Sequence, residues 1–141
     1  MSVYIDSSFL VSLYIRDQHS HAAIGKMTSD PAVWLTPLHV AEWTHAVEQH
    51  VFRRATSRTE ADQLYDRFQR HRESGLWVEV AVPESSFDVC AQLARRHVAQ
   101  SGVRTLDTLH VAAALELKAE CFWTFDDRQA KLAKANGLKL A

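Results

Sequence analysis

Short apolar runs alternate with helical stretches along the whole chain, and this alternation limits the fold more than any other feature. Runs rich in β-branched and aromatic residues occur at SVYID, AVWLT, LWVEVAV and CFWTF, and a short LKLA run closes the chain. One or more helical stretches separate each run from the next, and several are bounded by Ser, Pro or Gly. Alternation of this kind indicates a parallel sheet with helices on both faces. We therefore predict a three-layer α/β/α fold with a central, mainly parallel sheet.

The expected elements follow from periodicity and from the residues that begin and end helices. Ser7 or Ser8 is the expected N-cap of the first helix. Gly75 is expected to end the helix of 57–74, and Pro83 to lie near the start of the helix that Gly102 follows. The expected strands are 2–6, 32–36, 76–82, 121–125 and 138–141, and the expected helices are 7–17, 20–30, 38–54, 57–74, 83–102, 105–119 and 126–137.

Length and composition fit a single domain over residues 1–141. The chain has 141 residues, of which 47% are hydrophobic and 23% charged, an ordinary globular balance. The formal net charge of −1 means that any contact with nucleic acid must come from a local basic patch. Cys90 and Cys121 lack zinc-type spacing and are interpreted as small buried hydrophobes in a reducing compartment. Without a signal peptide or an apolar run long enough to cross a membrane, the expected location is the cytoplasm.

Acidic residues occur at the positions where a parallel α/β fold forms its sites. Asp6 follows the first strand, Asp126 and Asp127 follow the strand at 121–125, and Asp107 lies at the start of a helix. In such sheets, ligands bind at the carboxyl ends of the strands, near the point where the strand order reverses. Carboxylates that meet there repel each other, and a divalent cation removes the conflict.

The candidate ligands are therefore four carboxylates, which suit Mg²⁺ or Mn²⁺: Asp6, Glu42, Asp107 and Asp126. Each acid also has a structural explanation. Asp6 could cap the first helix, Glu42 could lie on the wet face of an amphipathic helix, and Asp107 could interact with a helix dipole. Asp126 or Asp127 could cap the last helix. The joint pattern, more than any single acid, predicts the metal site.

Four stretches also occur together in an order typical of one known family. YIDSSFLVSLY places an acid and two serines after the first strand, and HVAEWTHAV places a glutamate on a helix. RTLDTLHVAAAL has an arginine three residues before an aspartate, and FWTFDDRQAKLAKANGLKL has Thr-x-Asp after a strand. In these motifs the chain resembles the PIN-domain ribonucleases, in particular the VapC-type toxins of bacterial toxin–antitoxin pairs.

This resemblance implies roles for individual residues. It assigns Asp6, Glu42, Asp107 and Asp126 to the family's acidic quartet, with Mg²⁺ or Mn²⁺ as the cofactor. Ser8 and Thr124 would supply hydroxyls that orient the carboxylates, a role that Ser7 could share. Asp126 matches the spacing from Thr124, so Asp127 is expected to be the N-cap of the last helix or a peripheral ligand.

His110 lies three residues after Asp107, on the same helical face. It is interpreted as a packing or hydrogen-bonding residue beside the site, although a metal-ligand role stays open.

The resemblance implies an endoribonuclease that cleaves structured or single-stranded RNA. Arg104 is the basic residue nearest to Asp107 in sequence and is expected to contact the substrate. The other candidate phosphate contacts are Arg16, Arg53, Arg54, Arg95, Arg96 and Arg128. A small antitoxin and a second copy of the chain are the expected protein partners, with FLVSLYI and the helix from Leu38 as candidate surfaces.

Two other classes of Mg²⁺-binding α/β protein fit the sequence poorly. A Mg²⁺-dependent phosphoacceptor signalling domain needs an aspartate after a central strand, but LWVEVAV ends at Pro83 without one. A phosphatase of the haloacid-dehalogenase type needs a second aspartate that IDSSFLV lacks. A catalytically inactive RNA- or protein-binding module of the same fold remains the main alternative.

Overall fold

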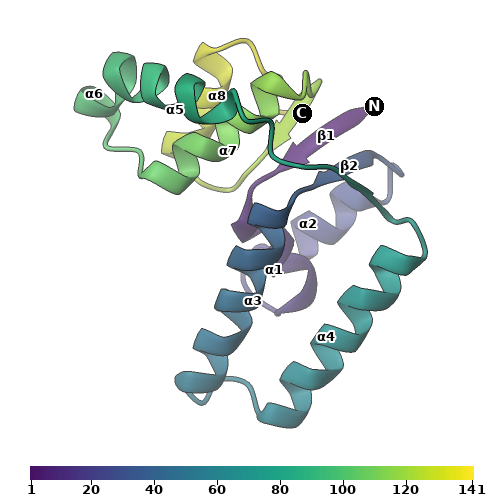
Figure 1. Ribbon diagram of the computed structural model, residues 1–141. Helices are drawn as coiled ribbons and strands as arrows, with labels where there is room; N and C mark the ends of the chain where they lie inside the picture. Colours follow the sequence, from purple (N-terminus) through teal and green to yellow (C-terminus); the bar gives the residue numbers. More distant parts are fainter.

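The computed structural model describes residues 1–141 and has a parallel sheet at its centre (Figure 1). The strands are β1 (Ser2–Ile5), β2 (Ala32–Leu35), β3 (Trp77–Glu79) and β4 (Cys121–Trp123). They form one four-stranded sheet in the order β3-β2-β1-β4, and every pairing is parallel. Because β1 lies between β2 and β4, the strand order reverses beside β1, and the segments that follow β1 and β4 leave the sheet side by side.

Helices cover both faces of the sheet and complete three layers, as predicted (Figure 1). On one face lie α1 (Ser7–Tyr14), α2 (Ser20–Met27), α3 (Pro37–Phe52) and α4 (Arg58–Glu73). On the other lie α5 (Ser86–Leu93), the π-helical turn η1 (Ala94–Val98), α6 (Ala99–Ser101), α7 (Thr105–Glu116) and α8 (Asp127–Ala135). None of the helices combines the length and the apolar character that a membrane crossing requires.

The central strands supply both cores because successive side chains of a strand point to opposite faces. Val3 and Ile5 of β1 are fully buried against the α1–α4 layer, whereas Tyr4 is fully buried against the α5–α8 layer. In the first core, Trp43 of α3 stacks on Phe68 at a centroid distance of 4.3 Å and meets Tyr14 edge-on at 5.3 Å. Aromatic pairs of this kind add about 0.5–1.5 kcal/mol each beyond the area they bury. They hold α3 against α1 and α4, and so place the residues that α3 carries.

Three expected elements differ most from the structure, and several others end two or three residues earlier than expected. The run at 138–141 forms only an isolated bridge, between Lys139 and Cys121, so the fifth strand was wrong. The strand expected at 76–82 is confined to Trp77–Glu79. The helix expected at 83–102 begins only at Ser86 and is interrupted by the π-helical turn. Pro83 therefore lies in the connection before the helix, where its missing N–H costs nothing.

Candidate active site

The segments that follow β1 and β4 meet at the carboxyl edge of the sheet. The Asp6 N–H donates to the carbonyl oxygen of Trp123 at 3.1 Å, which continues the β1–β4 ladder by one residue. Thr124 then directs its hydroxyl at the Asp6 carboxylate, with 3.1 Å between Oγ1 and Oδ2. The same hydroxyl accepts from the Asp126 N–H at 3.0 Å. Parallel pairing of adjacent central strands thus joins Asp6 to the segment that carries Asp126.

Asp6 is both the N-cap of α1 and part of this edge. Its backbone is extended, and its Oδ1 accepts from the Phe9 N–H at 2.8 Å. The expectation that Ser7 or Ser8 caps α1 was wrong, because both are already within the helix. Asp6 is only 3% exposed. Burial raises its pKa to about 6, and the negative charge of Asp107 adds to the rise, against the hydrogen bonds that favour ionisation.

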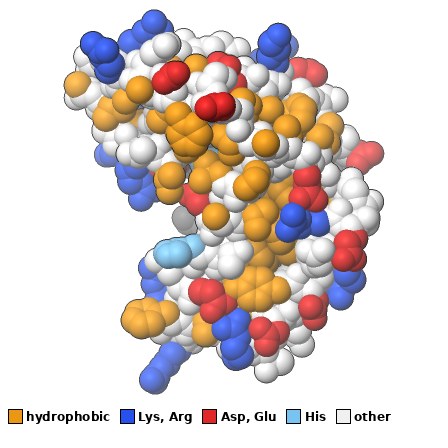
Figure 2. Space-filling model, viewed as in Figure 1, with side chains coloured by type: hydrophobic (Ala, Val, Ile, Leu, Met, Phe, Trp, Pro, Cys, Tyr) orange, Lys and Arg blue, Asp and Glu red, His pale blue; other side chains and the backbone are white.

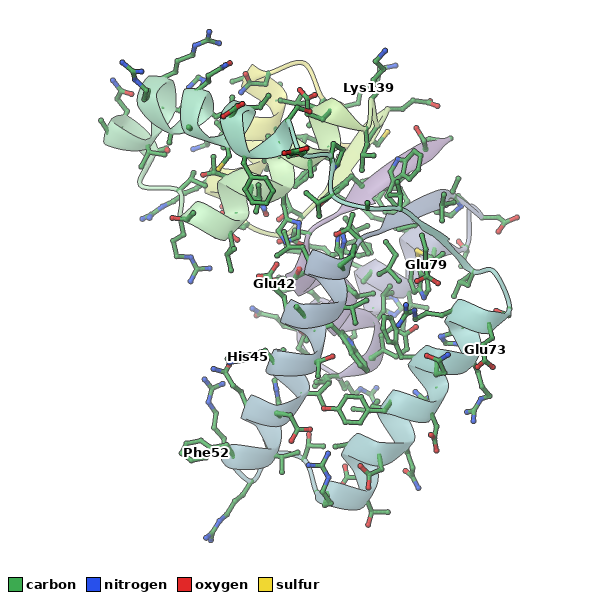
Figure 3. All side chains as sticks on the ribbon, viewed as in Figure 1. Glu42, His45, Phe52, Glu73, Glu79 and Lys139 are labelled. Atoms are coloured by element: carbon green, nitrogen blue, oxygen red, sulfur yellow. The ribbon has the colours of Figure 1, made fainter.

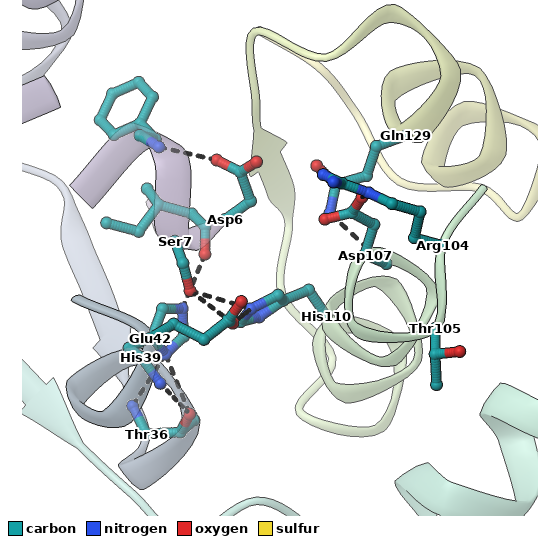
Figure 4. Close-up of polar contacts among 12 residues, drawn as sticks. Asp6, Ser7, Thr36, His39, Glu42, Arg104, Thr105, Asp107, His110 and Gln129 are labelled. Atoms are coloured by element: carbon teal, nitrogen blue, oxygen red, sulfur yellow. Dashed lines mark hydrogen bonds and ion pairs between the residues drawn. The ribbon is translucent and has the colours of Figure 1, made fainter. Parts of the chain in front are cut away.

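Asp107 lies in the first turn of α7, across a gap from Asp6 (Figure 4). Its Oδ2 accepts from Arg104 Nε at 3.1 Å, and the Arg104 side chain is 83% exposed. Gln129 of α8 donates from its amide nitrogen to the Asp107 carbonyl oxygen at 3.0 Å, and its Oε1 lies 2.8 Å from the Thr124 hydroxyl as a second possible acceptor beside Asp6. No sequence pattern predicts this role of Gln129, because a glutamine inside a helix carries no signal that it is buried.

Asp126 and Asp127 lie at the start of α8. Asp126 is the N-cap, and its Oδ1 accepts from the Gln129 N–H at 2.9 Å. The first of the two roles expected of Asp127, the N-cap, was therefore wrong, because Asp127 is the first helical residue. Its role as a peripheral ligand stays a prediction. Both aspartates line a surface cavity of about 440 Å³. The other residues that line this acidic cavity are Gly102, Val103, Arg104, Asp107 and Arg128.

Glu42 reaches the site from α3 and points towards α7 (Figures 3 and 4). Its Oε1 accepts from Ser7 Oγ at 2.7 Å and from the His110 ring. Burial opposes the charge on Glu42, but the hydrogen bonds from His110 and Ser7 outweigh it and lower the pKa of its carboxyl below the usual value. Ser8 is exposed and makes no hydrogen bond to any of the four acids, so Ser7 alone of the two serines contacts one of them.

A buried polar network lies beneath Glu42. His110 is 1% exposed, and its Nδ1 lies 2.7 Å from the Tyr4 hydroxyl. Since an ionised carboxylate only accepts, the His110 Nε2 carries the hydrogen that faces Glu42. In a neutral ring, Nδ1 then accepts the Tyr4 hydroxyl. Burial raises the pKa of Tyr4 far above its usual value, so this hydroxyl keeps its proton.

His39 is the second buried histidine, and it is a structural residue. Its Nε2 donates to the Ile5 carbonyl oxygen at 2.7 Å, and its Nδ1 accepts from the Thr36 N–H at 3.0 Å. Burial lowers the pKa of His39 to about 3, so the ring is neutral in the folded protein. His39 therefore joins the end of β1 to the start of α3, and so helps to place both Asp6 and Glu42.

The donors suit a hard divalent cation, although they do not surround one as they stand. No three His, Cys, Asp or Glu side chains are close enough together to hold a metal ion in this arrangement. Each acid instead has a protein partner: Arg104 for Asp107, His110 for Glu42, and a helix N–H group for Asp6 and for Asp126. Burial, with a smaller contribution from the charge of Asp107, raises the pKa of Asp6, and a cation at this edge would stabilise the ionised carboxylate. Carboxylate oxygens with space for water fit Mg²⁺ or Mn²⁺ better than a softer metal.

The fold and this edge define an α/β/α protein whose carboxylates gather at the carboxyl ends of parallel strands. Residues 3–135 match the PIN domain family. The chain therefore belongs to the PIN domain family. No curated protein matches the sequence.

Solved structures share the fold at low sequence identity. VapC20 of Mycobacterium tuberculosis, described as a Sarcin-Ricin loop cleaving toxin, matches with a TM-score of 0.72 and 16% identity over 99% of this chain and 98% of its own. FitAcB of Neisseria gonorrhoeae matches with a TM-score of 0.71 and 17% identity over 98% and 95%. VapBC2 of Rickettsia felis, bound to a DNA fragment from its promoter, matches with a TM-score of 0.68 and 13% identity over 100% and 98%. At these identities the likeness establishes the fold.

Proposed function

We propose that this chain is a Mg²⁺- or Mn²⁺-dependent endoribonuclease and the toxin of a toxin–antitoxin pair. The observation that carries the proposal is the meeting of Asp6, Asp107 and the Asp126 segment at one edge of a PIN domain. Three separate parts of the chain supply these groups, and burying Asp6 there opposes its ionisation. A carboxylate kept in so unfavourable a place is typical of a functional site. VapC20, which shares the fold, is described as a Sarcin-Ricin loop cleaving toxin.

In the proposed reaction, Asp6, Asp107 and Asp126 hold the cation, and Glu42 contributes negative charge from α3. When bound, the cation polarises a phosphoryl oxygen and lowers the pKa of a water molecule. Thr124 orients the Asp6 carboxylate through its hydroxyl. Arg104 is exposed beside Asp107, and its guanidinium can bind a phosphate of the RNA when it leaves that carboxylate. The cation would replace Arg104 as the partner of Asp107.

Cleavage and metal binding test this proposal together. Asp107→Asn should lower the cleavage rate of an RNA pool by more than about 100-fold, because it removes a ligand. Saturating Mn²⁺ should stabilise the wild-type fold by about 2.7 kcal/mol at 100 times the dissociation constant, and raise its melting midpoint by roughly 5–10 °C. Asp107→Asn should lose most of that rise.

Asp127→Asn is the matched control, since it removes the same charge from the same cavity. It should keep cleavage within about 10-fold of wild type. Cleavage by Asp107→Asn at the wild-type rate would contradict the proposal.

The alternative of a catalytically inactive RNA- or protein-binding domain is favoured by one observation. Every one of the four acids has a protein partner, and no ligand group is preassembled. On this alternative, Mn²⁺ leaves the melting midpoint unchanged and no variant alters RNA integrity.

The toxin role has its own test in cells. Induced expression of the wild-type chain should arrest cell growth. Cells that express Asp107→Asn at equal protein abundance should grow normally. Growth arrest by both proteins would mean that toxicity does not come from cleavage.

An antitoxin or a second copy of the chain needs an apolar surface to bind. One of the two surfaces expected from the sequence is exposed in the structure and the other is not. The FLVSLYI stretch is mostly internal, with Phe9 and Leu10 fully buried, so it is not the surface that we expected. The expectation for the helix from Leu38 is supported by a groove of about 790 Å³, which Val40 and Ala41 line with Val80. Figure 2 shows hydrophobic side chains gathered across the middle of this face. We propose this groove as the protein-binding face.

A further inference from the structure

A second cavity adjoins the acidic cavity and differs from it in charge. It has a volume of about 440 Å³ and lies where α8 meets η1 and α6. Its lining is His97, Gln100, Ser101, Arg128, Lys131, Leu132 and Ala135. No acidic side chain is among them, whereas the acidic cavity has three. Arg128 lines both cavities, so the two are neighbours that share its side chain.

The side chain of Arg128 packs beside Gly102. Gly102 follows α6 with a φ of +67°, in the left-handed region that glycine adopts without strain. One guanidinium nitrogen of Arg128 lies 3.5 Å from the place that a Cβ of Gly102 would occupy. Arg128 forms no ion pair with a carboxylate, although two aspartates precede it, whereas Arg104 pairs with Asp107. Its charge therefore stays available to a ligand.

The other polar residues of the second cavity continue its basic or neutral lining away from the three aspartates of the acidic cavity. Lys131 lies three residues after Arg128, on the same face of α8, and also forms no ion pair. His97 belongs to the π-helical turn and lines the cavity from the opposite side. Turns of this kind are often found at functional sites. Gln100 and Ser101 add neutral hydrogen-bonding groups.

We propose that this second cavity binds the phosphate backbone of the substrate RNA next to the bond that is cut. The proposal rests on the function proposed above. Arg128 and Lys131 would neutralise successive phosphates, and His97 would donate to one of them. The acid-free lining accepts a strand of phosphates, which the three acids of the neighbouring cavity would repel in the absence of a cation.

Strand binding without cleavage tests the proposal. The probe is a fluorescein-labelled single-stranded RNA of about 12 nucleotides, in EDTA, with anisotropy recorded over a series of salt concentrations. Lys131→Gln and Arg128→Gln should each weaken binding several-fold. Each should also lower the slope of log affinity against log salt by about 0.7. The two substitutions combined should lower it by about 1.4.

Lys139→Gln is the matched control, because it makes the same charge change on an exposed residue. Lys139 bridges to Cys121 at the opposite end of β4 from Asp126 (Figure 3). The Lys139→Gln variant should leave both the affinity for RNA and the slope of log affinity against log salt unchanged. Equal affinity for wild type, Lys131→Gln and Arg128→Gln would overturn the proposal, as would equal weakening by Lys139→Gln. The proposal would also be overturned if the cavity bound inorganic phosphate and its affinity for RNA did not depend on the length of the strand.

The outcomes separate this proposal from the nuclease proposal. If the wild type cleaves RNA but the cavity variants bind the strand normally, the second cavity is not the strand site and the nuclease stands. If no cleavage occurs but the variants lose affinity and slope, the strand site stands and the nuclease fails.

Discussion

Asp6→Asn is expected to abolish RNA cleavage and, in the same protein, to stabilise the fold at neutral pH. Loss of a ligand carboxylate should cost more than about 100-fold in rate. The gain in stability follows from burial, because Asp6 is 3% exposed and its folded pKa is about 6 rather than 3.8. A shift of this size corresponds to about 3 kcal/mol of destabilisation at pH 7, which an uncharged asparagine avoids.

The hydrogen bonds around position 6 also favour asparagine. Thr124 has a single hydroxyl hydrogen, but both Asp6 Oδ2 and Gln129 Oε1 lie within hydrogen-bond distance of it as acceptors. An asparagine can donate to the Thr124 oxygen, which leaves that hydrogen for Gln129. Its carbonyl oxygen still accepts from the Phe9 N–H, and asparagine caps helices as well as aspartate does.

The pH dependence provides the test. Between about pH 4 and 6 the folded wild type holds the Asp6 proton more tightly than the unfolded chain, so its stability falls as the pH rises through this range. Urea denaturation in EDTA should therefore show no advantage for Asp6→Asn below about pH 4 and a full advantage above about pH 6. Asp126→Asn changes an exposed N-cap of the same type and should alter stability by less than about 0.5 kcal/mol. A less stable Asp6→Asn at pH 7 would show that the carboxylate serves the fold.

Substitutions of His110 are expected to separate its support of Glu42 from its packing. His110 presents Nε2 to Glu42 and Nδ1 to the Tyr4 hydroxyl. A glutamine places its amide nitrogen near the position of Nε2, and an asparagine places its own near Nδ1. His110→Gln should therefore keep the contact with Glu42, and His110→Asn should lose it.

Both variants leave part of a buried site unfilled and should lose comparable stability, about 1–3 kcal/mol. Cleavage should fall about 10–100-fold in His110→Asn, the usual cost of losing a group that orients a ligand, and much less in His110→Gln. Tyr4→Phe removes the hydroxyl that fixes the ring of His110. This variant should reduce kcat with little change in KM. Equal rates in the two His110 variants at equal folded fraction would mean that the histidine only fills space.

Much of the architecture was predictable because it depends on local patterns. Alternating strand and helix periodicities are read from neighbouring residues, and only a few topologies bury a parallel sheet on both faces. The same local patterns could not predict where pairing stops. LKLA forms only one bridge with β4, between Lys139 and Cys121. The residue that caps a helix depends on the point at which the preceding strand ends. The preceding strands end before Asp6 and Asp126, so these two aspartates are the N-caps of α1 and α8.

By itself, the sequence determined the fold class and the four candidate acids. Asp6, Asp107 and Asp126 follow or begin an element whose type is encoded nearby, and Glu42 lies within a helix of a family motif. Only the tertiary structure decided their partners. Thr124 reaches Asp6 across 118 positions, and His110 reaches Glu42 across 68. The choice of Ser7 over Ser8, the role of Gln129 and the unpaired Arg128 depend on helix rotation and on packing between layers. Long-range geometry of this kind is set by the whole core, and no short stretch of residues encodes it.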